Sequence, residues 1–198
     1  MRTESLSSVS EQLGLGDHVA FFFKRNEERL SLAIPYLIDG LRNNESCVYV
    51  ADENTVPAIL AEFSNEGIDI EAFTSSGALR VVTKHNTYLR HGMFDPRRMI
   101  DDLDSEVKNA LHQGFVGLRI TAEMSWALDL PSVLGRVCEY ERDLLRSWPA
   151  QMGGLCQYNE TRFPRDVIET IANSHHLVVR DGEIVRHPER IQVDTLSA

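Results

Sequence analysis

The sequence lacks the motifs and segments that mark several common classes of protein. Its 12 glycines form neither a GxxxxGKS/T nor a GxGxxG pattern, so no standard phosphate-binding loop is present. No apolar run approaches the ~20 residues that a membrane-spanning helix requires. The opening segment MRTESLSSVSEQLG has no apolar stretch of the kind found in a signal peptide. We therefore expect a cytoplasmic protein that does not bind a membrane.

Cysteine is also sparse. The three cysteines, Cys47, Cys138 and Cys156, are far apart, and no CxxC or HExxH pattern accompanies them. A disulfide framework, a metal site and a cofactor are therefore not expected, and we interpret the cysteines as core residues. Cys156 could act as a nucleophile only beside a base, and nothing in the sequence places His175 or His176 near its thiol.

Positive charge is in deficit. The chain has 20 basic and 30 acidic residues, a formal net charge of −10, and no long basic run. Surfaces that bind DNA or RNA are normally basic. Direct binding of nucleic acid is therefore not expected.

The sequence does contain a regular alternation of apolar strands and amphipathic helices. HVAFFF and CVYVA are typical of buried strands, and the helix between them has apolar residues at steps of three and four. HLVVRDGEIVR, near the end, has the Asp-Gly turn of a hairpin. The alternation predicts a three-layer α/β fold, with a mostly parallel sheet flanked by helices. We expect this domain over residues 16–188, after an N-terminal helical extension (residues 1–15) and before a polar tail (residues 189–198).

The loop after the first strand differs chemically from a phosphate-binding loop. In this layout phosphates normally bind between the first strand and the first helix, where this sequence has KRNEER. That segment has no glycine, and Glu27 and Glu28 would repel a phosphate at the amino end of the helix. We therefore expect no tight binding of ATP and no enzymatic activity.

Aromatic and acidic residues gather where the predicted strands end, which is where parallel α/β folds bind ligands. Trp126 and Tyr88 could form flat apolar walls, and Arg119 with Glu123 could orient a small organic ligand. We predict a cavity touched by Trp126 and at least one of the other three; the alternative is that Trp126 is core packing. The candidate ligand-binding residues are Phe23, Glu53, Tyr88, Arg119, Glu123, Trp126 and Tyr158.

Arg119 lies within a predicted strand that is covered on both faces, so its guanidinium needs a carboxylate partner. Glu141 falls on the apolar stripe of the helix predicted over residues 131–148. The sequence therefore predicts a structural ion pair between Arg119 and Glu141, with Glu139 and Glu123 as the other candidate partners.

Several segments, in order, resemble one known family. They are GDHVAFFF, EERLSLAIPYLIDGLRNNESCVYVADE, GMFDPRRMI, GLRITAEMSWAL, EYE, and LCQYN followed by RFP. These segments are similar to the MEDS family, the methanogen/methylotroph, DcmR sensory domain, from about Gly16 to His187. The resemblance implies a fold similar to RecA/KaiC-type ATPases with a degenerate nucleotide site, in which KRNEER takes the place of the phosphate loop.

The resemblance also implies a function. The family is proposed to sense small hydrocarbon-derived compounds in signal transduction and transcriptional control, and its members are often fused to histidine kinases or DNA-binding domains. These 198 residues contain neither fusion, so we expect output through a separate signalling partner or through a homo-oligomer. The first hypothesis is thus a non-enzymatic sensory domain that binds a small organic ligand. The alternatives are a nucleotide-binding or weakly hydrolytic ATPase relative and a pure protein-interaction module.

Overall fold

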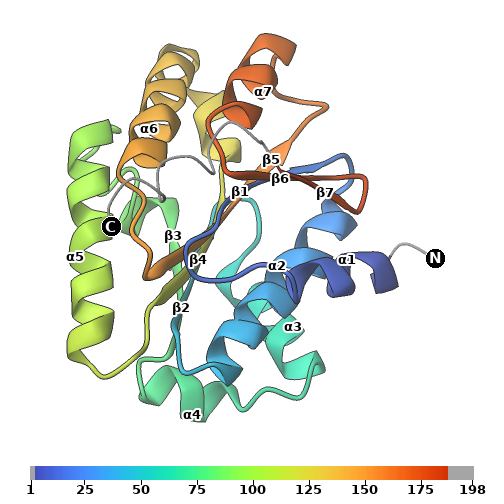
Figure 1. Ribbon diagram of the computed structural model, residues 1–198, viewed down its shortest axis with the longest axis vertical. Coiled ribbons are helices and arrows are strands. Elements are labelled where there is room, and N and C mark those ends of the chain that lie inside the picture. Colours follow the sequence, from blue (N-terminus) through green and yellow to red (C-terminus); the bar gives the residue numbers. More distant parts are fainter. Residues whose placement is uncertain (1–2, 187–198) are drawn as a thin grey trace, which may run out of the picture.

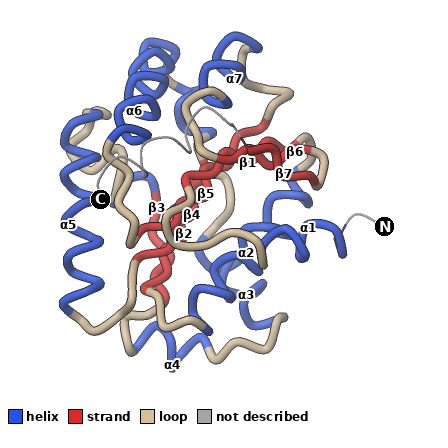
Figure 2. The backbone as a smooth tube through the Cα atoms, in the orientation of Figure 1, coloured by secondary structure: helices blue, strands red, loops and turns tan. Residues whose placement is uncertain are grey.

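The computed structural model describes residues 3–186, so the predicted tail over residues 189–198 lies outside the described part. Its centre is a seven-stranded sheet in the order β3-β2-β4-β5-β1-β6-β7 (Figures 1 and 2). Neighbouring strands are parallel except for β6 and β7, which form an antiparallel hairpin. The strands are β1 His18–Phe23, β2 Ser46–Ala51, β3 Leu79–Thr83, β4 Leu118–Glu123, β5 Met152–Asn159, β6 Leu177–Arg180 and β7 Glu183–Arg186.

Helices cover both faces of the sheet, which confirms the predicted three-layer α/β architecture (Figure 1). One face carries α1 Thr3–Ser10, α2 Asn26–Arg42, α3 Val56–Asn65 and α4 Ile70–Ser75. The other face carries α5 Pro96–His112, α6 Leu134–Arg146 and α7 Arg165–Ala172. Short 3-10 turns are η1 Lys84–Asn86, η2 Ser125–Asp129 and η3 Pro131–Val133, so the helix expected over residues 131–148 begins with a 3-10 turn and is α-helical from Leu134. None of the helices within residues 3–186 is long and apolar enough to cross a membrane.

Strand alternation decides which side chains enter which core. Along β1, Phe21 and Phe23 pack against the α2 layer, whereas Ala20 and Phe22 pack against the α6 layer. His18 is two residues before Ala20, so it faces the α6 layer as well. The first strand therefore delivers a buried histidine into the core on this face of the sheet.

The terminal hairpin has the turn that its sequence predicts. Asp181 and Gly182 connect β6 to β7 with φ angles of 53° and 82°. Two successive positive φ angles are the geometry that Asp-Gly favours in a two-residue hairpin loop.

Candidate functional site

The carboxyl edge of the sheet holds its own buried anion, Glu123 at the end of β4. The Glu123 carboxylate accepts backbone N–H groups from Asp52 (2.9 Å), Glu53 (2.6 Å) and Asn54 (3.1 Å). It also accepts hydrogen bonds from the Tyr49 hydroxyl (2.8 Å) and from Asn54 Nδ2 (2.7 Å). A carboxylate has about four lone-pair positions. The donors at this edge are therefore already committed to a protein carboxylate.

The amino end of α2 is occupied in the same way. Glu28 accepts the backbone N–H of Lys24 at 3.0 Å and forms an ion pair with the Arg25 side chain at 3.0 Å. The next residue, Arg29, is buried, binds Glu53 at 2.9 Å and lies over the ring of Phe23. A phosphate arriving here would have to displace these carboxylates.

Trp126 and Tyr88 do come together, but as core packing. Their rings stack with centroids 4.9 Å apart, and Phe94 packs against Trp126 at 5.1 Å. Trp126 is only 1% exposed. The cavity beside Tyr88 has a volume of about 20 Å³, enough for about one water molecule. The surroundings of Trp126 therefore agree with the alternative interpretation, in which its indole is part of the core packing.

The predicted ion pair between Arg119 and Glu141 is wrong. Arg119 makes a two-pronged pair with Glu45, with Nε–Oε2 at 2.5 Å and Nη2–Oε1 at 2.9 Å, and donates to the Tyr36 carbonyl at 2.9 Å. The reason is that Arg119 faces the α2 layer, whereas Glu141 projects from α6 on the opposite face. Because Arg119 is the second residue of β4, it also lies at the opposite end of that strand from Glu123.

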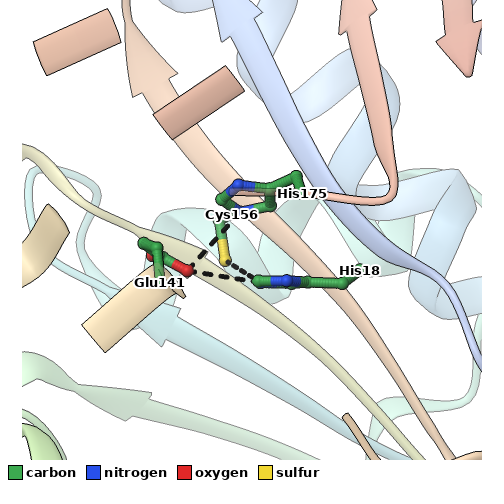
Figure 3. Close-up of side chains that lie close together, drawn as sticks. All are labelled: His18, Glu141, Cys156 and His175. Carbon is green, nitrogen blue, oxygen red and sulfur yellow. Dashed lines mark hydrogen bonds and ion pairs between the residues drawn. The ribbon is translucent and has the colours of Figure 1, made fainter. Parts of the chain in front are cut away.

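Glu141 belongs instead to a group of buried polar side chains that lies under α6 and α7. This group, called here the His–Glu–Cys cluster, consists of His18, Glu141, Cys156 and His175 (Figure 3). Glu141 Oε2 is 3.3 Å from His18 Nε2 and 3.5 Å from His175 Nε2, and Cys156 Sγ is 3.9 Å from His18 Nε2. One donor atom from each residue lies within 4.8 Å of all the others.

The strand order assembles this cluster from distant parts of the sequence. β1 lies between β5 and β6, so His18 of β1, Cys156 of β5 and His175 just before β6 are neighbours on one face. α6 crosses above them and contributes Glu141, which is fully buried. The anomalous position of Glu141 on an apolar stripe was the one sign of this cluster in the sequence, because neither the strand order nor the face that α6 covers could be read there.

Burial shifts the pKa values of three members of the cluster. It raises the pKa of the Glu141 carboxyl, raises that of the Cys156 thiol well above its ordinary value, and, with nearby His18, lowers the pKa of His175 to about 3. The Tyr158 hydroxyl donates to Glu141 Oε1 at 2.5 Å, and His175 Nδ1 donates to the Ile171 carbonyl at 2.8 Å. Tyr158, predicted as a ligand contact, thus holds Glu141 in place.

Trp148 separates the cluster from an open groove between α6 and α7. Its indole stacks on His18 with centroids 4.1 Å apart and donates from Nε1 to the Met152 carbonyl at 2.8 Å. The groove beyond it has a volume of about 960 Å³. Its lining residues are Gly16, Arg142, Leu145, Arg146, Trp148, Ala150, Thr170, Asn173, Ser174 and His176.

The arrangement of the sheet and its helices defines the class of fold. A mostly parallel sheet with helices on both faces is the architecture of RecA/KaiC-like domains, and solved structures of this class match it. A KaiC-like protein of the hyperthermophilic archaeon Pyrococcus horikoshii has a TM-score of 0.58 at 13% identity, over 84% of this chain and 71% of that chain. An uncharacterized protein of the same organism, solved with an unknown peptide, has a TM-score of 0.63 at 14% identity, over 88% of this chain and 81% of that chain. At these identities the likeness concerns the fold alone.

The chain belongs to the MEDS family, the MEthanogen/methylotroph, DcmR Sensory domain, whose sequence model matches residues 17–176. It is 26% identical over 162 residues to the transcriptional repressor DcmR of Methylorubrum extorquens. That similarity covers 80% of this chain and 58% of DcmR, so the chain spans less than two thirds of its relative. The resemblance that the sequence motifs indicated is confirmed.

Proposed function

We propose that this domain is a non-enzymatic sensor that binds a small organic, hydrocarbon-derived compound in the groove between α6 and α7. The sensory class is supported by membership of the MEDS family and by similarity to a transcriptional repressor. The location of the binding site is inferred from the groove itself. Its volume of about 960 Å³ is at the upper end of the range for small-molecule sites, roughly 300–1,000 Å³.

The lining of the groove fits a compound with an apolar body and a polar or anionic end. Leu145 and Trp148 supply apolar surface, and Arg142 and Arg146 supply two exposed cations near one wall. A short-chain carboxylate could place its hydrocarbon chain against the indole and its charge beside a guanidinium. This location differs from the carboxyl edge favoured by the sequence, because Glu123 and Trp126 are already engaged there.

The proposal that the domain is not an enzyme is supported by the segments after β1 and β2, where domains of this fold class bind phosphates. Glu28 and Glu123 take up backbone N–H groups in the two segments, after β1 and after β2, where an anion would otherwise bind. Neither segment offers the glycine-rich cradle that phosphates need. We therefore propose that the fold is kept for signalling and not for hydrolysis.

The output of such a sensor would pass to a histidine kinase or a transcription regulator in the cytoplasm, or through self-association. The name of the relative DcmR, a transcriptional repressor, supports a regulatory partner. A ligand bound between α6 and α7 could change the relative positions of these two helices, which lie on one face of the sheet (Figure 1).

Thermal melts with butyrate, butan-1-ol and butylamine at equal concentration test this proposal. We expect butyrate to raise the melting temperature most, and the double variant Arg142→Ala/Arg146→Ala to lose that increase. Both arginines are exposed, so the double variant should fold. The matched control is Arg97→Ala, an exposed arginine on α5 that does not line the groove. If no compound stabilises the protein, and native mass spectrometry finds none bound after purification, the proposal fails.

A further inference from the structure

We propose that His18, Glu141, Cys156 and His175 form a binding site for a divalent transition metal ion of the zinc type. The proposal rests on the His–Glu–Cys cluster and does not depend on ligand binding in the groove. The scattered positions of these residues in the sequence give no metal-binding spacing, so only the strand order and the packing of α6 on the sheet bring them together.

Three of the six distances between the four donor atoms are close to the edges of a tetrahedral site, and all six are within 4.8 Å. Zinc–nitrogen and zinc–oxygen bonds of about 2.0–2.2 Å, and zinc–sulfur bonds of about 2.3 Å, imply edges of roughly 3.4 Å between N and O and roughly 3.6 Å between N and S. The observed edges are 3.3 Å and 3.5 Å from Glu141 Oε2 to the two Nε2 atoms, and 3.9 Å from Cys156 Sγ to His18 Nε2 (Figure 3). Rotation of the side chains would have to bring the remaining distances to tetrahedral values.

His175 Nε2 and Glu141 Oε2 face each other in a way that a cation between them would stabilise. His175 Nδ1 donates to the Ile171 carbonyl, so in the neutral ring the lone pair is on Nε2. That lone pair faces Glu141 Oε2 at 3.5 Å, and neither atom makes a hydrogen bond within residues 3–186. Two buried acceptors that face each other are unfavourable unless a proton or a metal ion lies between them.

The set of donors selects the kind of ion. Two imidazoles, one thiolate and one carboxylate suit zinc and its tetrahedral substitute cobalt, and they suit calcium and magnesium poorly. The two negative charges of thiolate and carboxylate would balance a divalent ion, which lowers the cost of burying it. Binding releases to solvent the thiol proton of Cys156 and any proton held between Glu141 and His175.

The surroundings of the cluster resemble the supporting contacts of a metal site. Ligating histidines commonly donate their second nitrogen to a backbone carbonyl, as His175 does to Ile171. The Glu141 oxygen that does not face the imidazoles accepts the Tyr158 hydroxyl at 2.5 Å. With four protein ligands the site would be closed, and closed sites are structural or sensory and not catalytic.

Ion binding should also change the fluorescence of Trp148. The rings of His18 and His175 stack with centroids 3.9 Å apart and planes 30° apart. Both must turn for their Nε2 lone pairs to converge on one ion. Because Trp148 stacks on the other face of His18 at 4.1 Å, this rotation should change its fluorescence.

The test is titration of the chelator-treated full chain with Co²⁺ and then Zn²⁺. We expect one Co²⁺ per chain, with the visible bands of a tetrahedral ion and a thiolate-to-cobalt charge-transfer band that Zn²⁺ abolishes. The tryptophan fluorescence of the chain should change in step with those bands, because Trp148 stacks on His18. Cys156→Ser should lose the charge-transfer band, whereas Cys47→Ser, a matched change at a buried cysteine on the other face of the sheet, should keep it.

Two further variants keep the test decisive if Cys156→Ser is poorly folded. Glu141→Gln preserves shape but removes one charge, and it should abolish stoichiometric binding. Tyr158→Phe removes only the supporting hydrogen bond, and it should weaken Zn²⁺ affinity by about 10–100-fold. Absence of the charge-transfer band from the folded wild-type chain would overturn the proposal, as would a band that survives in folded Cys156→Ser or Glu141→Gln.

Discussion

Trp148 and His18 stack with their ring centroids 4.1 Å apart, and the glycine beside His18 makes this contact possible. Gly154 pairs with His18 across β5 and β1. A Cβ atom on Gly154 would lie 2.4 Å from the Trp148 ring. The indole can therefore cover the His–Glu–Cys cluster only because this position has no side chain.

Gly154→Ala should displace Trp148 from His18. We expect a loss of about 1–3 kcal/mol in the free energy of unfolding, the usual cost of overpacking, and a red-shifted tryptophan emission. Urea denaturation followed by fluorescence measures both. Gly135→Ala is the matched control, because a Cβ there meets no atom within 4 Å and alanine is favoured over glycine in a helix by roughly 0.5–1 kcal/mol. Equal effects of the two changes would refute the role given to Gly154.

Arg119→Met should destabilise the protein strongly through Glu45. The two side chains are 2% and 4% exposed as residues, and the substitution leaves a buried carboxylate without its partner. We expect a loss of about 3–5 kcal/mol. Arg80→Met breaks a half-exposed pair with Glu106 and should cost less than about 1 kcal/mol. Urea melts of both variants give the comparison, and a small effect at Arg119 would contradict the assignment.

Trp126→Ala should behave as the loss of a core residue. The indole is enclosed by Tyr88 and Phe94, so we expect a loss of about 3–5 kcal/mol in unfolding free energy. Trp126→Phe should cost much less, because the Trp126 Nε1 makes no hydrogen bond within the described residues. A near-neutral Trp126→Ala with weakened response to butyrate would instead restore the pocket predicted from the sequence.

Millimolar Mg-ATP should not raise the melting temperature. Binding at 100 times the dissociation constant would add about 2.7 kcal/mol of stability, which a thermal melt detects easily. Glu28 and Glu123 occupy the relevant N–H groups, so we expect curves with Mg-ATP and with Mg²⁺ alone to superimpose. A clear shift with Mg-ATP only would show that the nucleotide site survives.

The secondary structure and the class of fold could be predicted from the sequence because they depend on short-range patterns. Alternation in HVAFFF separates Phe21 and Phe23 from Phe22 whatever the neighbouring strands are, and Asp-Gly selects its turn locally. The lack of glycine in KRNEER can likewise be read from a short segment of the sequence. The ordered motifs were sufficient to indicate the MEDS family.

The partners of the buried charges were decided only by the tertiary structure. The sequence indicates that Arg119 and Glu141 are charged residues at buried positions, but they do not pair, because β4 turns Arg119 towards α2 while α6 covers the opposite face. The strand order places His18, Cys156 and His175 on the face that α6 covers, around Glu141. Periodicity gives the face of a strand on which a side chain lies; only the order of the strands and the layer above them determine what it meets.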